Sequence, residues 1–215
     1  MKRIVAIMLL ISALALTLSG CGEKPEAPAS SAPADVVSSA SEQQSDPSGS
    51  FGTQTEGKSD VLVAVFSATG NTRAVAEKIA RLTGADFYEI TPAQPYTDED
   101  RNWHDDNSRT SKEQNDKSAR PALAGEELSL AGYKTVYIGY PIWWGEEPRV
   151  MDTFVEKYDF GGITCIPFCT SGSSGIGSSG KNLARNAGSG DWLDGKRFPA
   201  GVAETELKEW IDSLK

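Results

Sequence analysis

A short polar segment of the sequence combines residue types that bind phosphate: Ser67, Ala68, Thr69, Gly70, Asn71 and Thr72. It lies between an apolar run and a helical pattern, and the start of a helix favours negative groups because the helix dipole is positive there. Gly70 lets the backbone approach a ligand closely. Neither the Walker pattern nor Gly-x-Gly-x-x-Gly is present. The segment therefore predicts a phosphate cradle without lysine, although the same residue types also serve as plain helix caps.

A second loop carries two adjacent tryptophans next to a glycine, in the order Pro141, Ile142, Trp143, Trp144 and Gly145. Large aromatic faces at the tip of a loop suit a flat ring ligand. The alternative is that one or both rings pack over the edge of a sheet. The neighbouring phosphate loop favours the ligand.

The apolar patterns around these loops predict alternating strands and helices. Strands are expected at 61–66, 87–90, 133–140 and 163–169, with Pro167 near the end of its strand and a weak fifth strand at 197–200. Helices are expected at 72–82, 148–158 and 181–187, and at the C-terminus through Leu207, Trp210, Ile211 and Leu214. The polar stretch 91–132 is an insertion or lid. This order predicts an α/β fold, a three-layer doubly wound five-stranded parallel sheet with strand order 2-1-3-4-5.

Ligands of such sheets bind at the carboxyl ends of the strands, which places the chemistry after residues 66, 139 and 169. The three loops there, Ser67 to Thr72, Gly139 to Glu146 and Phe168 to Gly175, together resemble the FMN loops of the flavodoxin superfamily. The resemblance is closest to its flavodoxin-like lipoproteins and reductases, and it covers residues 60–215.

The resemblance implies a role for each loop. Residues 67–72 would hold the FMN phosphate, Trp143 would stack on the flavin ring, and Trp144 and Gly145 would offer backbone N–H groups to its edge. The third loop would close around the pyrimidine end through Thr170, Ser171, Gly172 and Gly175. It contains no aromatic residue, so the other ring face is expected to be open, with Tyr96 or Trp103 of the insertion as alternative covers.

The predicted function is electron transfer by noncovalently bound FMN, with no catalytic side chain and an unidentified protein or quinone as redox partner. Stacking on Trp143 and an acidic protein surface are expected to lower the potential of the flavin. An NAD(P)H-dependent quinone or flavin reductase is the alternative, and a binding module that has lost its flavin is a third. The formal charge of −9 argues against nucleic acid as a partner.

The N-terminus resembles that of a bacterial lipoprotein. Residues 1–20 have the pattern of a signal peptide, with an uncleaved anchor as the alternative, and Leu18-Ser19-Gly20-Cys21 looks like a lipobox. This implies a lipid on Cys21 and a cell-membrane location on the extracytoplasmic side. Residues 21–59, rich in Pro, Ala and Ser, are expected to form a disordered tether.

A few other residues invite functional interpretations. Cys165 and Cys169 are expected to be free, buried thiols, and no metal site is predicted. His104 is expected in a solvated acidic loop with Asp98, Glu99, Asp100, Asp105 and Asp106. Arg73 is a phosphate contact or an exposed helix residue. Glu146 and Glu147 are expected to serve the N-terminus of the following helix.

Overall fold

The structure, a computed structural model, describes residues 59–215. The predicted signal peptide, the lipidation site Cys21 and all but the last residue of the tether lie outside the described residues. Among residues 59–215, no helix has the length and apolar character needed to cross a membrane.

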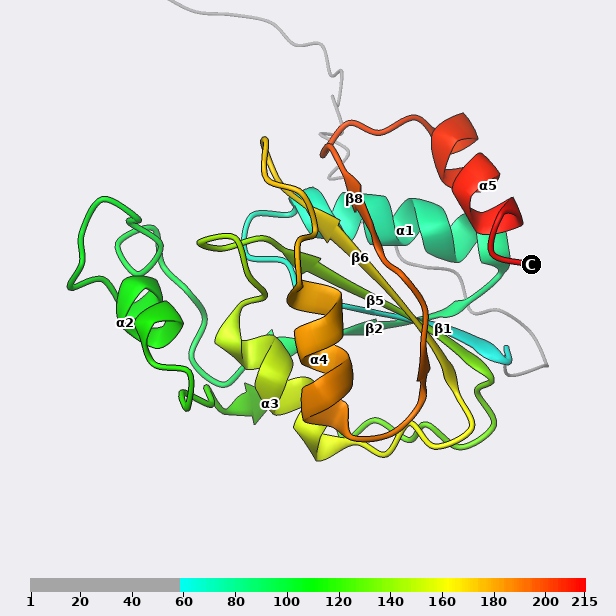
Figure 1. The fold of residues 1–215 in the computed structure, drawn as a ribbon, viewed down its shortest axis with the longest axis horizontal. Helices are drawn as coiled ribbons and strands as arrows, with labels where there is room; N and C mark the ends of the chain where they lie inside the picture. Colours follow the sequence, from blue (N-terminus) through cyan, green and yellow to red (C-terminus); the bar gives the residue numbers. More distant parts are fainter. Residues whose placement is uncertain (1–58) are drawn as a thin grey trace, which may run out of the picture. The chain divides into compact units, whose positions relative to one another are not determined.

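A parallel sheet forms the centre of the fold (Figure 1). Its order is β2-β1-β5-β6, and β7 and β8 both pair with the far side of β6. The strands are β1 (Val61–Val65), β2 (Asp86–Glu89), β5 (Thr135–Pro141), β6 (Thr164–Thr170), β7 (Asp191–Trp192) and β8 (Lys196–Phe198). Every pair in this sheet is parallel. The predicted parallel doubly wound order is confirmed.

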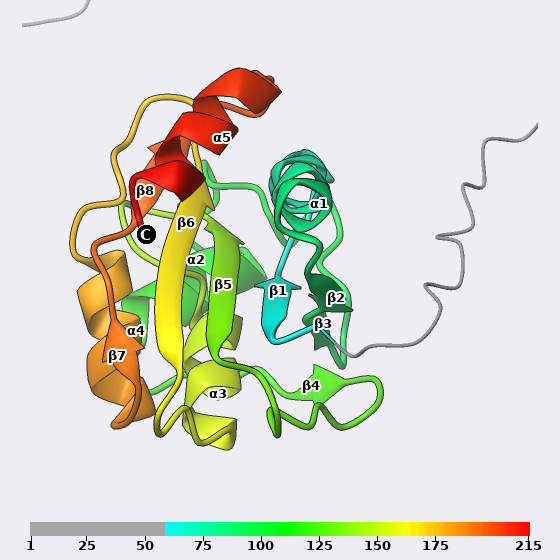
Figure 2. The same cartoon turned by 90° about the vertical axis from the view of Figure 1, so that its right-hand side faces the viewer.

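Helices cover both faces of the sheet, so the fold has three layers (Figure 2). One face carries α1 (Asn71–Thr83) and α5 (Glu204–Asp212), and the other carries α3 (Arg149–Lys157) and α4 (Ser179–Ala187). Because neighbouring strand residues point to opposite faces, each strand contributes to two cores. In β1, Val63 and Val65 pack with α1 and α5, whereas Leu62 and Ala64 pack with α3 and α4.

The fifth strand differs from the prediction because it is split into β7 and β8. Pro167 lies in the middle of β6, opposite Ile138, and not near the strand's end as predicted. Proline has no N–H to donate, so the edge partner of β6 breaks opposite this residue. Gly195 fills the break, where a Cβ atom would lie 2.6 Å from the carbonyl oxygen of Pro167.

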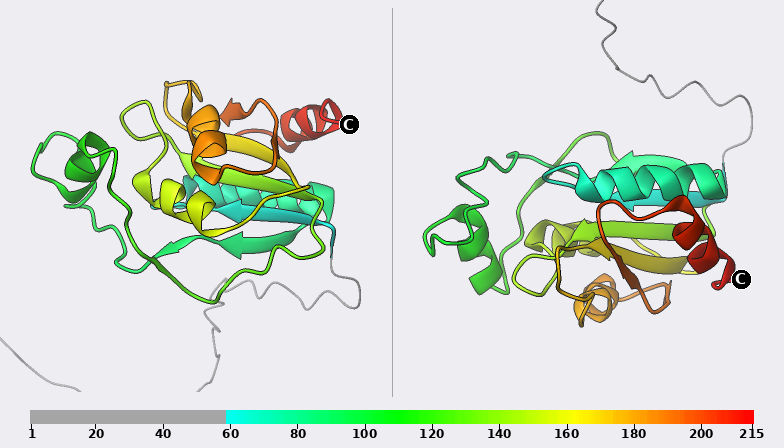
Figure 3. Two further views of the ribbon diagram at one scale, coloured as in Figure 1. Left: turned by 60° about the horizontal axis from the view of Figure 1, so that its bottom comes forward. Right: turned by 90° about the horizontal axis from the view of Figure 1, so that it is seen from above.

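The insertion, residues 91–132, has secondary structure of its own, and its two ends pair with each other. Its first and last parts, β3 (Thr91–Pro92) and β4 (Leu123–Ala124), pair antiparallel and form a separate two-stranded sheet. Helix α2 (Arg109–Asn115) lies between them. Its N-cap residue is Ser108, whose side-chain hydroxyl accepts a hydrogen bond from the N–H of Ser111. Figures 1 and 3 show α2 beyond one end of the main sheet.

Cys165 and Cys169 are free thiols, and both side chains are buried, as predicted. Burial raises the pKa of each thiol to about 12. Both thiols therefore stay protonated at neutral pH and are poor nucleophiles.

Candidate functional site

Three loops meet where β1, β5 and β6 end, and direct hydrogen bonds join them. The N–H of Phe66 donates to the carbonyl of Gly139 over 2.9 Å, and the N–H of Ile142 donates to the carbonyl of Thr170 over 3.0 Å. The hydroxyls of Thr72 and Thr170 lie 2.8 Å apart. The structure thus brings all three predicted loops to one edge of the sheet.

The first loop leaves the N-terminus of α1 without a side-chain cap. The N-cap residue is Gly70, with a φ of 83°, and within the described residues no side-chain hydrogen bond caps the helix. The hydroxyl of Thr72 is bonded to Thr170, and the amide of Asn71 donates to Thr69. The side chains of Asn71 and Thr72 therefore do not cap α1. The first N–H groups of α1 remain available for an acceptor from outside the chain.

Ser67 at the start of this loop has a buried hydroxyl that finds no hydrogen-bond partner among residues 59–215. Such an atom costs free energy unless a ligand or a water satisfies it. Ser67 lines a small cavity of about 180 Å³ together with Glu89 and Tyr96, beside the main groove.

The second loop is a tight hairpin turn centred on Trp144 and Gly145. Trp143 and Glu146 exchange two backbone hydrogen bonds of 3.0 Å each, and the two residues between them have φ values of 50° and 81°. Positive φ at both central positions defines a type I′ turn. This conformation is costly for Trp144, and strain of this kind is concentrated at functional sites. The N–H groups of Trp144 and Gly145 take no part in the turn's hydrogen bonds.

The two tryptophans have different environments. Trp143 is half-buried and meets the rings of Phe66 and Tyr96 edge-on, at centroid distances of 5.6 and 5.1 Å. Trp144 is 46% exposed. Both line a cavity of about 320 Å³, which is shared by the first loop and the insertion, and whose other residues are Ala68, Thr69, Arg101, Trp103, Thr110, Pro141 and Ile142.

A second cavity of about 300 Å³ adjoins the first and shares Thr69, Pro141 and Ile142 with it. Its other lining residues are Asn71, Thr170, Ser171, Gly172, Arg197, Pro199 and Ala200. Five of the predicted residues lie in the three loops but line neither cavity: Ser67, Gly70, Thr72, Gly145 and Gly175. The two cavities, together called the loop groove below, form one site at the carboxyl edge of the sheet.

The insertion contributes more to the loop groove than the sequence suggested. Arg101, Trp103 and Thr110 line the first cavity, and Tyr96 supports Trp143. Gln114 of α2 donates its amide to the carbonyl oxygens of Trp143 and Glu147, over 3.0 and 3.2 Å. The insertion therefore helps to fix the tryptophan loop.

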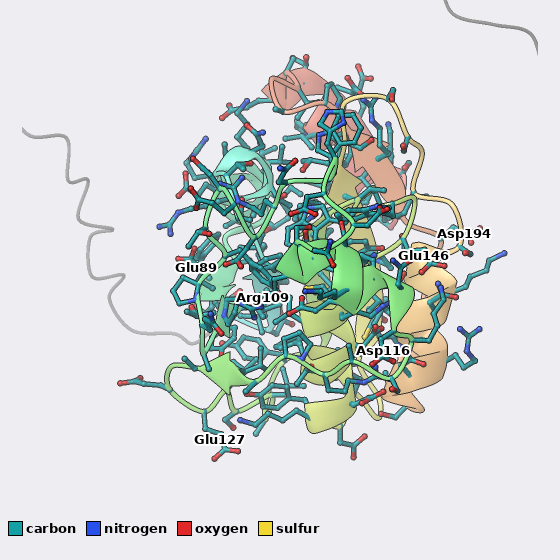
Figure 4. The ribbon with its side chains drawn as sticks, turned by 90° about the vertical axis from the view of Figure 1, so that its left-hand side faces the viewer. Glu89, Arg109, Asp116, Glu127, Glu146 and Asp194 are labelled. Atoms are coloured by element: carbon teal, nitrogen blue, oxygen red, sulfur yellow. The ribbon has the colours of Figure 1, made fainter. Side chains whose placement is uncertain are left out.

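A buried ion cluster lies behind the tryptophan loop and corrects the expectation for Glu146 and Glu147. Pro148 precedes α3, and in the described part of the chain no side chain caps this helix. Instead, the buried guanidinium of Arg149 pairs with Glu146 at 2.6 Å, Asp152 at 3.2 Å and Glu147 at 3.6 Å. Figure 4 looks onto the insertion side, where Arg109 and Asp116 mark α2 and Glu146 lies close by. Lys117, just after α2, pairs with Glu146.

Glu147 is the member of this cluster whose negative charge is least favourable in the folded protein. Its side chain is 1% exposed, and desolvation raises its pKa to about 7, although Asn182 donates to the carboxylate over 3.2 Å. One guanidinium cannot neutralise three carboxylates equally. The folded protein therefore favours a neutral Glu147 up to about neutral pH.

The Glu147→Gln substitution is expected to stabilise the protein more at pH 8 than at pH 5. The folded-state pKa of Glu147 lies above its ordinary value of 4.5, so the wild type loses stability as the pH rises from about 4.5 to about 7. Glutamine carries no such penalty. Thermal unfolding at both pH values should show a melting-temperature gain that is larger at pH 8, by about 5 °C. Equal gains at both values would contradict this assignment.

Neither Arg73 nor His104 is among the residues that line the loop groove. Arg73 pairs with Glu77 at 2.9 Å and with Glu89, so it is engaged on the surface of α1. His104 is exposed in the insertion, beside the ring of Trp103. Within residues 59–215, no group of three or more His, Cys, Asp and Glu side chains could hold a metal ion.

Comparisons with known proteins identify the family to which the chain belongs. A search of curated proteins gave no match. The chain resembles the solved structure of a proposed flavoprotein from Bacteroides uniformis, at 47% identity and a TM-score of 0.68 over 71% of this chain and 97% of that one. A similar protein from Bacteroides eggerthii is 42% identical, with a TM-score of 0.68 over 72% of this chain and 96% of that one.

A more distant structure shares the fold. The flavoprotein of Lactobacillus acidophilus, solved in complex with FMN, is 18% identical, with a TM-score of 0.53 over 70% of this chain and 97% of that one. The family model described as flavodoxin matches residues 60–214, which include all of the loop groove. The chain therefore belongs to the flavodoxin family.

Proposed function

We propose that the protein binds FMN noncovalently in the loop groove and transfers electrons. One observation carries most weight: the uncapped N-terminus of α1 opens next to a cavity lined by three tryptophans. A phosphate suits the first feature and a flat ring suits the second. The Lactobacillus flavoprotein of the same fold holds FMN.

The residues of the groove fit the parts of this cofactor. The first N–H groups of α1, with Thr69 and Asn71, would hold the phosphate. Trp143 and Trp144 would contact the ring, and the third loop would lie along its polar end. When bound, FMN supplies the electron-transfer chemistry, and the protein supplies binding, orientation and electrostatics.

The visible absorption spectrum of the purified protein tests this proposal. We expect flavin absorption in the protein as isolated, or its recovery when FMN is added to the colourless protein. Quenching of flavin fluorescence during the titration would give the dissociation constant. A protein that neither carries nor takes up FMN would contradict the proposal.

A second candidate function is that of an NAD(P)H-dependent quinone or flavin reductase. The observation that favours it is the contribution of Arg101, Trp103 and Thr110 to the first cavity, because an aromatic wall could also receive a flat substrate. Consumption of NAD(P)H with a quinone separates the two candidates. A carrier should turn over NAD(P)H poorly, whereas a reductase should consume it steadily.

We further propose that the protein is held on the extracytoplasmic side of the cell membrane by a lipid on Cys21. The support is the lipobox-like sequence before this cysteine and the Pro, Ala and Ser-rich stretch after it. Cell fractionation of the wild type and of Cys21→Ala tests the anchor. The wild type should sediment with membranes, and equal sedimentation of the two proteins would contradict the proposal.

A further inference from the structure

One positively charged residue that lines the loop groove, Arg197, lies outside the three loops at the ends of β1, β5 and β6. Arg197 lies in β8, where it pairs in register with Cys169 of β6. This register brings it to the carboxyl edge of the sheet, and its side chain lines the second cavity with Thr69 and Asn71.

The guanidinium of Arg197 holds the third loop by its backbone. Its Nε donates to the hydroxyl of Ser171 over 3.2 Å, and its Nη2 donates to the carbonyl oxygens of Ser171 and Gly172. Three hydrogen bonds from one planar group fix both the side chain and the loop. Arg197 is thus held in place before any ligand arrives.

The charge of Arg197 is not compensated by a carboxylate. Among the described residues that line the two cavities, only Arg101 and Arg197 are charged, and Arg101 pairs with Asp98. Arg197 forms no ion pair within residues 59–215, and its acceptors there are neutral oxygens. A fixed, half-buried positive charge in a ligand cavity attracts an anion or an electron-rich group.

We infer that Arg197 stabilises the reduced cofactor by placing its charge at the polar end of the flavin ring. This inference rests on the proposed FMN site. The loop that Arg197 holds is the one expected at the pyrimidine end, where reduction leaves the ring richer in electrons. A charge close to the ring tunes its electronics, and here it opposes the acidic protein surface. Arg197 therefore raises the midpoint potential.

The Arg197→Gln variant removes the charge and keeps a side chain that forms hydrogen bonds. We expect the affinity for reduced FMN, relative to that for oxidised FMN, to fall about tenfold, which lowers the midpoint potential of a two-electron couple by about 30 mV. Spectroelectrochemical titration of the full chain measures this potential. Titration with oxidised FMN measures the loss of affinity that both redox forms share. This loss should be smaller than the loss for reduced FMN, because the charge acts mainly on the reduced form.

Two further variants separate the charge from the support of the loop. Arg197→Lys keeps the charge but loses the planar group, and it should restore at least half of the lost potential. Lys196→Gln removes the same charge one residue earlier, where the ammonium lies 3.8 Å from Glu206 and 5.2 Å from the Phe198 ring centroid. It should leave the potential unchanged.

Other results would overturn the inference. An unchanged potential in Arg197→Gln contradicts it. A loss of FMN affinity without a loss of riboflavin affinity, at constant potential, would show that Arg197 binds the phosphate instead. Equal shifts in Arg197→Gln and Lys196→Gln would show a general effect of net charge. Failure of the wild type to take up FMN contradicts the proposed function itself, so the two failures are distinguishable.

Discussion

Replacing Trp143 with alanine is expected to destabilise the protein by about 3 kcal/mol and to weaken FMN binding at least tenfold. The first effect follows from its packing, because the half-buried ring contacts Phe66 and Tyr96 edge-on. The second follows from its place in the wall of the first cavity. Denaturant unfolding of the protein without FMN and fluorescence titration with FMN measure the two effects separately.

Trp144→Ala and Trp103→Ala are the matched controls for Trp143→Ala. Both tryptophans line the same cavity, but they are 46% and 66% exposed, so little packing is lost when they are truncated. Trp144→Ala should weaken FMN binding and leave stability almost unchanged. Trp103→Ala tests whether the insertion covers the second face of the flavin ring, which the sequence predicts to be open. A Trp143→Ala protein with normal affinity would show that Trp143 only supports the turn.

The main sheet could be predicted because its strands are buried on both faces. Val61 to Phe66 is a continuous apolar run, and the buried positions of α1 recur with helical spacing. The second piece of the fifth strand, β8, overlaps the strand predicted at 197–200, but the split and the first piece could not be predicted in this way. Its two pieces are two and three residues long, and their position depends on Pro167 of the neighbouring strand. Such short pieces carry no periodicity of their own.

In the site, too, the residues that follow the strands could be predicted from the sequence, whereas those from the insertion could not. The residues of the three loops follow directly after strands, so the edge of the sheet locates them. Arg101, Thr110 and Gln114 come from a polar insertion, where sequence pattern does not reveal which side chains face inward. Arg197 could have been found, because its strand ends at the same edge as the other loops. The weak pattern of that strand concealed it.

The double variant Thr69→Ala/Asn71→Ala is expected to weaken FMN binding about 100-fold and to weaken riboflavin binding far less. Both side chains line the second cavity next to the uncapped end of α1. Each hydrogen bond to a charged group contributes about 1.5–3 kcal/mol, so losing two of them accounts for this factor. Riboflavin has no phosphate, so its affinity should depend on these residues only through Thr69, which also lines the first cavity.

The folding stability of the same variant shows whether the loss of affinity is specific. Neither side chain caps α1, and within residues 59–215 the side-chain amide of Asn71 forms a hydrogen bond only with Thr69, so removing both leaves no buried group there unpaired. The free energy of unfolding without FMN should stay within about 0.5 kcal/mol of the wild type. If riboflavin and FMN lose affinity equally, the first loop does not hold the phosphate. A selective loss at constant stability would assign the phosphate to the N-terminus of α1, with the ring then placed in reach of Trp143 and Trp144.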